Sequence, residues 1–523
     1  MRAASLALAL MLAAGAARAQ SPPTAAVEGG QVSGVADGAV TYFKGIPYAA
    51  PPVGALRWRA PQPVIPWSGM RAADHYGHDC MQVPFAADDA PTRTQPDEDC
   101  LVANVWRPSA PSAKPLPVIV WIYGGGLITG GTSPAIYDGS AFAKQGVVFV
   151  SFNYRLGRFG FFGFPALTAA DADHGLLGNY GYMDQIAAMK WVQRNIAAFG
   201  GDPAQVTVFG ESAGGGSVHM LLTSPLAQGL FARAMIESGG GRGAAKGPRL
   251  LSQDRPEKPS SESLGVAFAR AKGITGTDAA ALAALRALPE SEIANGMSLG
   301  DADAQAATYG GAMIDGRLVV EEPQAAYLAG HDAKVPLVIG ANSDDLRPWN
   351  AKTKDEAFAR FPDPAAARAA YDPEGTATLE ALDANMGRNQ MMLEPARFVA
   401  AALAAQGAPV WAFRFSYVAK VHQGEWVGAH HASEIPYVMD QVTARYGAAT
   451  TPADVAVGEV ANRYWVNFAK TGDPNGPGLP HWPRYDAASD QILNFNPAGQ
   501  AEPEADPLKA QLDVTASAAT AAK

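Results

Sequence analysis

A serine stands between two glycines at a predicted junction of a strand and a helix. The strand-forming segment Val206–Phe209 runs into Gly210-Glu211-Ser212-Ala213-Gly214, and small residues and a helical pattern follow. This Gly-x-Ser-x-Gly spacing is typical of a nucleophile elbow, a sharp turn that exposes the serine hydroxyl near a helix N-terminus. The motif predicts Ser212 as a nucleophile for acyl transfer. The pentapeptide alone is a weak signal, so the rest of the chain must supply the other catalytic groups.

Three consecutive glycines form a second candidate element of the same chemistry. Gly124-Gly125-Gly126 follow the almost wholly apolar segment Val118–Ile122, which predicts a central strand. Glycines let the backbone approach a substrate closely, so their amide N–H groups can point at a developing oxyanion. We expect two of these N–H groups, together with that of Ala213, to form an oxyanion hole.

The general base must come from the nine histidines of the chain. In the elbow architecture the histidine follows the acid and lies late in the sequence, beyond a final strand. The adjacent His430 and His431 meet this requirement, and His422 and His481 are competitors. Spacing alone does not separate His430 from His431.

The acid of such a site orients the imidazole and stabilises the imidazolium. Asp344 and Asp345 follow a predicted strand at 337–340. A carboxylate in this place is suitably positioned for that role. The alternative interpretation is a solvated pair of aspartates at the end of a strand.

The elements that must position these residues alternate along the chain. Residues 183–198 carry apolar side chains on one helical face and are followed by Gly200-Gly201, a helix stop. Strands are predicted at 118–122, 147–152, 206–209, 235–240, 335–340 and 410–417. The alternation predicts an α/β fold with a mostly parallel central sheet covered by helices. Segments near 241–330 and 346–406 break the alternation and are predicted to be helical cap insertions.

Two other segments are expected to lack regular structure. Proline and glycine are so frequent between residues 43 and 58 that we expect an ordered loop there, packed on the core by Tyr48 and Trp58. The last twenty residues are small and polar, and we expect them to fray.

Composition limits the classes of partner. The 523 residues are 48% hydrophobic and carry a formal net charge of −10. An acidic chain without clustered Lys and Arg argues against nucleic acid or an anionic membrane as the main partner. After the N-terminus, no stretch of the sequence is apolar for long enough to predict stable membrane insertion.

The N-terminus resembles a secretory signal. Arg2 precedes an apolar run from residue 3 to 14, and Ala17-Arg18-Ala19 is a small-x-small cleavage site before Gln20. We therefore expect residues 1–19 to be removed and the protein to be secreted or periplasmic. The apolar run is too short to span a bilayer as an anchor.

The chain has two cysteines, Cys80 and Cys100. Export implies an oxidising compartment, so we expect them to pair as a disulfide, which would stabilise the chain by about 3 kcal/mol. The alternative is two free buried thiols. Two cysteines this far apart without clustered histidines do not predict a metal site.

Taken together, these motifs resemble one family, the type-B carboxylesterases, or cholinesterase-like branch of the α/β-hydrolases. The resemblance runs from Phe43 to about Asn475, over blocks that stand in the family's order: Gly45-Ile46-Pro47-Tyr48-Ala49, Glu98-Asp99-Cys100-Leu101, Tyr123 to Gly126, Asn153-Tyr154-Arg155, Gly200 to Pro203 and Phe209 to Gly215. It implies an α/β-hydrolase fold, with residues 20–523 forming a single domain. It also implies a serine carboxylic-ester hydrolase that needs no metal or cofactor and acts on small-molecule esters.

The resemblance also implies roles for individual residues. The family's histidine stands three residues before a Glu-Ile pair, which selects His431. Its acid corresponds to Asp345, although the family usually has Glu there and a Gly where this chain has Leu346. Because Asp is one methylene shorter than Glu, Asp344 stays possible.

The resemblance places the oxyanion donors and the disulfide as well. The family's donors correspond to Gly125, Gly126 and Ala213, and its early disulfide corresponds to Cys80 and Cys100. Cholinesterases also carry a Trp inside that disulfide loop to hold a quaternary ammonium group, and such recognition requires an aromatic face. Residues 81–99 contain no Trp and only one aromatic residue, Phe85, so we predict against choline esters.

Three functional hypotheses follow. The leading one is a serine carboxylesterase for small to medium esters. The second is a lipase or an esterase specialised for a polyester or natural-product ester. The third is a non-catalytic binding protein on the esterase scaffold, against which Ser212 and His431 argue.

Overall fold

A computed structural model describes residues 21–85, 88–242, 248–300, 306–346 and 350–521. The expected signal peptide and its cleavage site at residue 19 lie outside this part of the chain. Within the described residues, eleven strands form one sheet in the order β16-β15-β14-β13-β12-β11-β7-β8-β6-β4-β3. Their bounds are β3 Val35–Asp37, β4 Val40–Pro47, β6 Val102–Pro108, β7 Leu116–Ile122, β8 Val148–Phe152, β11 Gly201–Glu211, β12 Arg233–Glu237, β13 Leu337–Asn342, β14 Val410–Phe415, β15 Gln491–Phe495 and β16 Ala501–Ala505.

The middle of this sheet is parallel and its edges are antiparallel. From β8 through β7, β11, β12, β13 and β14 to β15, each strand pairs with its neighbour in parallel. The edge strands β16, β6, β4 and β3 pair antiparallel. The predicted α/β class with a mostly parallel sheet is confirmed, and the carboxyl ends of the parallel strands meet at one edge, where α/β proteins build their sites.

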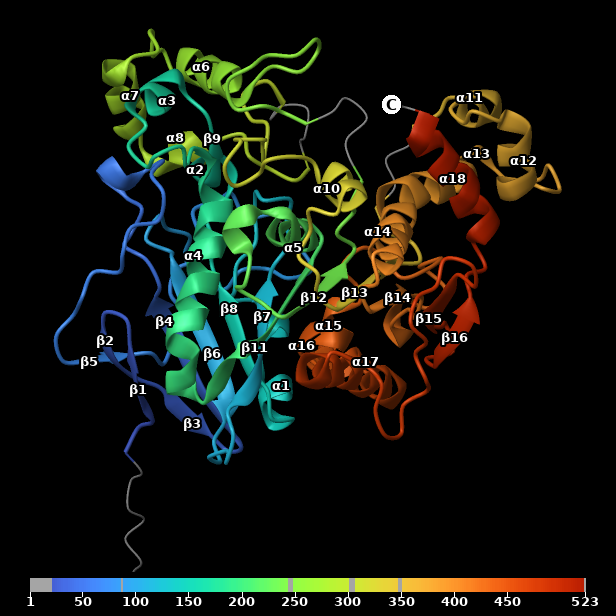
Figure 1. The fold of residues 1–523 in the computed structure, drawn as a ribbon, viewed down its shortest axis with the longest axis horizontal. Helices are drawn as coiled ribbons and strands as arrows, with labels where there is room; N and C mark the ends of the chain where they lie inside the picture. The colour runs from blue at the N-terminus through green and yellow to red at the C-terminus, as the bar shows by residue number, and fades with distance from the viewer. Residues whose placement is uncertain (1–20, 86–87, 243–247, 301–305, 347–349, 522–523) are drawn as a thin grey trace, which may run out of the picture.

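Helices cover the sheet and explain why its strands are apolar on both faces. Residues Val118 to Ile122 of β7 are fully buried. Helix α5 packs against β11 and β12, α14 against β13 and β14, and α17 against β7 and β11 (Figure 1). The bounds of the helices that flank the sheet are α4 Tyr180–Asn195, α5 Ala213–Thr223, α14 Glu394–Ala405 and α17 Pro452–Thr471.

The two segments predicted as insertions are largely helical. The first contains α6 Ser261–Ala271, α7 Ala279–Arg286, α8 Glu290–Ala294 and α10 Pro323–Ala329, of which α6, α7 and α8 gather at the top of Figure 1. The second contains α11 Lys354–Ala359, α12 Pro364–Tyr371 and α13 Leu379–Arg388, which lie beside the C-terminal helix α18 at the upper right. These three helices share a small apolar core of their own, which includes Phe358 and Leu382.

The prediction of an irregular loop from residue 43 onward is wrong for its first part. Strand β4 runs from Val40 to Pro47 and pairs with β6. The pairing register shifts between Phe43 and Ile46, and Gly45 takes a φ of 71°. A glycine at such a bulge lets the ladder resume beyond it, so the glycine that seemed to forbid a strand makes this one possible.

The expected fraying of the last residues is also wrong. Helix α18 spans Lys509–Ala521, and its Leu512 is fully buried against Met392 and Leu393. Just before this helix, Asp506 accepts two hydrogen bonds from Arg414, at 2.8 and 2.7 Å. This paired contact between Arg414 and Asp506 anchors the chain just before α18. The small residues of the C-terminal segment do not predict such an anchor.

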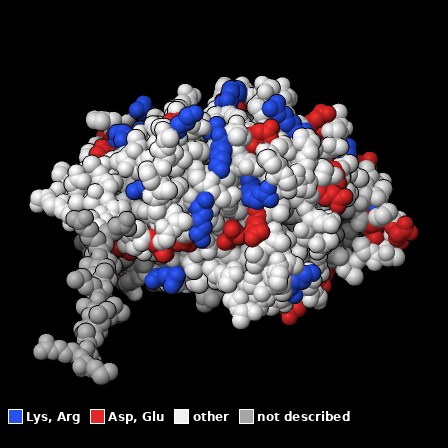
Figure 2. All heavy atoms as spheres, turned by 90° about the horizontal axis from the view of Figure 1, so that it is seen from below, with Lys and Arg blue, Asp and Glu red and all other residues white. Residues whose placement is uncertain are grey.

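The predicted disulfide is present. Cys80 and Cys100 are joined by an S–S bond of 2.04 Å. Among the described helices, none is long and apolar enough to cross a membrane. On the face drawn in Figure 2, basic and acidic side chains are intermingled on a mostly uncharged surface.

Candidate active site

Ser212 lies between β11 and α5 on a backbone turn that few residues adopt. Its φ is 55° and its ψ is −123°, a strained conformation of the kind that clusters at functional positions. A Cβ on Gly210 would lie 2.6 Å from the carbonyl carbon of Gly214, and one on Gly214 would lie 2.0 Å from Ile122 O. The turn therefore requires glycine at both motif positions.

The imidazole of His431 lies between Ser212 and Asp345. Its Nε2 is 2.8 Å from Ser212 Oγ, and its Nδ1 is 2.6 Å from Asp345 Oδ1. These distances join hydroxyl, imidazole and carboxylate in one chain of hydrogen bonds. This is the arrangement that activates a serine for attack on a carbonyl carbon.

The other candidate bases and acid lie elsewhere. Nε2 of His430 is 3.2 Å from Asp344 Oδ2, so these residues form a second Asp–His pair. His422 stacks on Trp426 with ring centroids 4.0 Å apart, and His481 is exposed. The geometry thus separates His431 from His430 and Asp345 from Asp344, which spacing in the sequence leaves open.

Asp345 is held by several donors besides His431. Its Oδ2 accepts from Ser238 Oγ at 2.6 Å and from the Asn342 N–H at 3.0 Å, and its Oδ1 accepts from the Leu346 N–H at 2.8 Å. Burial acts to raise the pKa of Asp345, but His431 and the hydrogen bond from Ser238 outweigh it and lower that pKa. The carboxylate therefore stays ionised and fixes the orientation of the imidazole.

The glycine turn after β7 lies against the elbow. A Cβ on Gly124 would be 2.9 Å from Ser212 Cβ. Gly125 and Gly126 have φ values of 92° and 64°, which favour glycine. In the described part of the chain, no hydrogen bond uses the N–H of Gly125 or Gly126, and the N–H of Ala213, the first residue of α5, has no partner within its helix. These three donors are therefore available to a ligand atom.

Gln82 supports this glycine turn, although no motif in the sequence predicts such a role for it. Its Oε1 accepts from Thr129 Oγ1 at 2.6 Å and from the Gly130 N–H at 2.8 Å, while its Nε2 donates to Gly130 O at 2.6 Å and to Cys80 O at 2.9 Å. The Thr129 N–H in turn donates to Gly125 O. The disulfide at Cys80 is thereby tied to the turn that carries the candidate oxyanion donors. A glutamine in a loop has no pattern that would single it out.

Ser238 was also missed, although it ends a predicted strand. It follows β12 directly, has a φ of 47° and is buried. Its backbone N–H donates to Gly340 O on β13. Its place directly before Gly239-Gly240, where the predicted strand must end, was the available signal in the sequence.

Glu211 and Glu434 act electrostatically on His431, and the buried Glu237 interacts with both of these carboxyl groups. Glu211 Oε1 is 3.3 Å from His431 Nε2. Burial raises the pKa of Glu434 to about 7 and those of Glu211 and Glu237 well above the ordinary value. For His431, burial acts to lower the pKa, but Glu211 and Asp345 outweigh it and raise that pKa. Glu211 stands inside the Gly-x-Ser-x-Gly motif, which is the signal that could have marked it.

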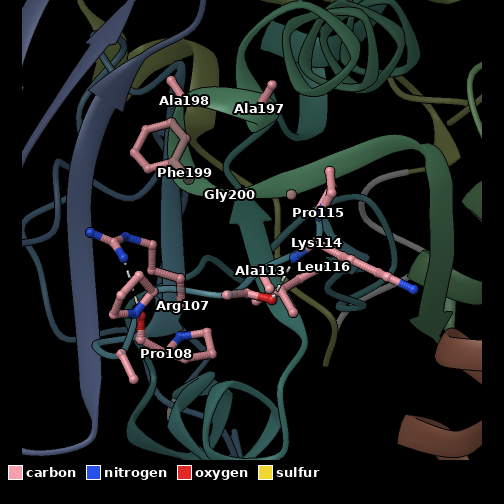
Figure 3. A pocket seen from close by; sticks show the side chains of 14 residues that line it. Arg107, Pro108, Ala113, Lys114, Pro115, Leu116, Ala197, Ala198, Phe199 and Gly200 are labelled. Atoms are coloured by element: carbon pink, nitrogen blue, oxygen red, sulfur yellow. Dashed lines mark hydrogen bonds between the residues drawn. The ribbon is translucent and has the colours of Figure 1, made fainter.

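A cavity elsewhere in the molecule does not belong to this site. It measures about 410 Å³ and is lined by residues that include Arg107, Lys114, Leu116 and Phe199 (Figure 3). Leu116 begins β7 and Gly201 begins β11, whereas Ser212 follows the last residue of β11. The cavity therefore lies at the edge of the sheet opposite to Ser212.

Comparisons with known proteins identify the family of this chain. The model of the Carboxylesterase family matches residues 21–374 and 365–513. The chain is 34% identical to fumonisin B1 esterase of Sphingopyxis macrogoltabida, over 90% of this chain and 85% of that protein, and 34% identical to para-nitrobenzyl esterase of Bacillus subtilis, over 89% and 93%. A solved structure of PNB esterase superimposes with a TM-score of 0.78 and 30% identity, covering 94% of this chain and 99% of that one. The chain therefore belongs to the carboxylesterase family.

Proposed function

We propose that this protein is a serine carboxylesterase that hydrolyses small to medium carboxylic esters through an acyl-enzyme. The hydrogen-bonded chain from Ser212 through His431 to Asp345 carries this proposal. Membership of the carboxylesterase family supports it. Neither a metal nor a cofactor is required for the steps below.

In the first half of the reaction, Ser212 Oγ attacks the ester carbonyl carbon while His431 Nε2 takes the hydroxyl proton. The N–H groups of Gly125, Gly126 and Ala213 stabilise the oxyanion of the tetrahedral intermediate, each donor contributing roughly 3 kcal/mol. When the C–O bond breaks, the imidazolium returns the proton to the leaving alkoxide. Water then repeats the sequence on the acyl-enzyme and releases the acid.

A second candidate is an esterase specialised for a larger natural-product ester, a polyester or a lipid. The similarity to a relative named for fumonisin B1 favours the natural-product case. Hydrolysis rates over a panel of acyl chain lengths, alcohol sizes and emulsified substrates distinguish these candidates. A marked rise in rate at an oil–water interface identifies a lipase.

The first test replaces the nucleophile. Ser212→Ala should lower kcat for p-nitrophenyl esters by about 10⁶-fold, because the residual rate comes only from the oxyanion hole and binding. It should also abolish labelling by organophosphates. The exposed Ser291 provides a matched control, and Ser291→Ala should leave both unchanged. Undiminished hydrolysis by Ser212→Ala rules out the proposed function.

The second test separates the two aspartates. Asp345→Asn should lower kcat by about 10⁴-fold, because the amide cannot stabilise the imidazolium and favours the wrong tautomer. Asp344→Asn should have a far smaller effect, because Asp344 contacts His430 instead. Steady-state kinetics of both variants decide the point, and the opposite order of effects would make Asp344 the acid.

The third test concerns the pH dependence. His431 must be neutral to act as a base, and the carboxyl of Glu211 raises its pKa. Glu211→Gln should therefore lower that pKa and move the acidic limb of the kcat/KM profile to lower pH. Glu374→Gln, at an exposed position, should leave the limb in place. A limb that stays or moves to higher pH in Glu211→Gln contradicts the assignment.

We further propose that the protein is exported and begins at Gln20 after cleavage. The signal-like N-terminus supports this, as does the disulfide, because disulfides persist in oxidising compartments. After expression with its own N-terminus in a Gram-negative host, the mature protein should lack residues 1–19. Mass spectrometry of periplasmic and extracellular fractions checks this, and an intact N-terminus in the cytoplasm contradicts it.

A further inference from the structure

Two Asp–His pairs lie on opposite sides of an isolated parallel bridge between two segments. The Asp344 N–H donates to Ala429 O, and Asp344 forms a parallel bridge with His430. Successive side chains of an extended segment point to opposite sides. Asp345 and His431 accordingly meet on the side of Ser212, and Asp344 and His430 meet on the other.

The second pair is continued by a stack of three rings. His430 stacks on Trp426 with centroids 4.1 Å apart and an interplanar angle of 17°. The other face of Trp426 carries His422, at 4.0 Å and 3°. His430 is also fixed at its carbonyl oxygen, which accepts from Asn342 Nδ2 and from Ser433 Oγ, both at 2.7 Å.

Asp344 and Asp345 are adjacent aspartates, and His430 and His431 are adjacent histidines. The pairing register of the two segments therefore decides which aspartate meets which histidine. A slip by one residue would bring the wrong aspartate opposite the wrong histidine, because the side chains of a strand alternate with a period of two. Ala432, directly after His431, has a φ of 66°. A non-glycine residue in that region is strained and persists only where surrounding contacts hold it.

We propose that His430, stacked on Trp426 and paired with Asp344, is a positioning residue that holds His431 in register between Ser212 and Asp345. This inference rests on the proposed function, since it assigns the effect to a catalytic His431. His430 itself does not contact the reacting atoms. The stack acts through the backbone that His430 shares with His431.

Kinetics of stack variants test the proposal. His430→Ala and Trp426→Ala should lower kcat about 10- to 100-fold, because a shift of about 1 Å in a catalytic group has effects of this size. KM should change less than about 2-fold, since ground-state binding is untouched. Trp426→Phe keeps a stacking ring and should recover most of kcat. Val427→Ala is the matched control, because Val427 is the next residue and is 88% exposed.

The pH profile supplies a readout that a loss of folding would not produce. A looser contact between His431 and Asp345 should lower the pKa of His431, while the other carboxyl groups that act on it, those of Glu211 and Glu434, remain. The acidic limb of kcat should therefore move to lower pH in Trp426→Ala and stay in Val427→Ala. Trp426→Leu, which keeps apolar volume without a ring, should repeat the shift if Trp426→Ala is poorly folded.

The outcomes are distinguishable. If His430→Ala, Trp426→Ala and Trp426→Leu keep the wild-type kcat and the wild-type position of the acidic limb of the pH profile, the positioning role is wrong. The esterase assignment still stands in that case, provided that Ser212→Ala is inactive. If Ser212→Ala keeps full activity, the proposed function itself fails. A kcat lowered equally in the Phe and Leu variants would also overturn the role of ring stacking.

Discussion

The close approach of three backbone segments at the end of β7 is the constraint on which the rest of this structure depends. Ile122 O, the elbow and the glycine turn meet so closely that a single Cβ at Gly124, Gly210 or Gly214 would come within 3 Å of other atoms. Parallel pairing of β7 with β11 sets this distance. The sheet thus acts as a rigid frame, and Ser212 receives its half-buried, strained position from neighbours that have no side chains.

The parts of the site that could be predicted from the sequence are those for which backbone geometry demands particular residue types. A strained turn needs glycines and a central strand needs apolar residues, so the positions of Ser212 and of the glycine turn were readable in advance. The choice of His431 and Asp345 was different. Each stands beside an identical neighbour, and only tertiary pairing, anticipated through the family resemblance, tells the members of each doublet apart.

What could not be predicted depends on contacts between distant segments. Gln82 and Ser238 act through hydrogen bonds to loops far away in the sequence. Strand β4 forms because β6 offers a partner on which a bulge can form. Helix α18 is held by a buried leucine and by the chain just before it. Local composition does not reveal such partners, so it predicted a loop where β4 forms and fraying where α18 forms.

The carboxyl groups near His431 have pKa shifts of opposite direction because their surroundings differ. Asp345 is buried but accepts hydrogen bonds from several donors, which keep it charged. Glu211, Glu237 and Glu434 are buried with fewer donors, and burial shifts them toward the neutral form. Unequal solvation and hydrogen bonding of this kind give neighbouring carboxyl groups pKa shifts of opposite direction within one site.

The route from Cys80 through Gln82 to the glycine turn has a consequence for preparing the protein. In a reducing cytosol the sheet and the elbow would still assemble, because the disulfide takes no part in either. The loop that steadies the turn would lose its covalent tether, so a sample that is well folded by spectroscopy would contain molecules with a displaced glycine turn. Specific activities from different expression hosts should therefore be normalised to titrated nucleophile rather than to protein mass.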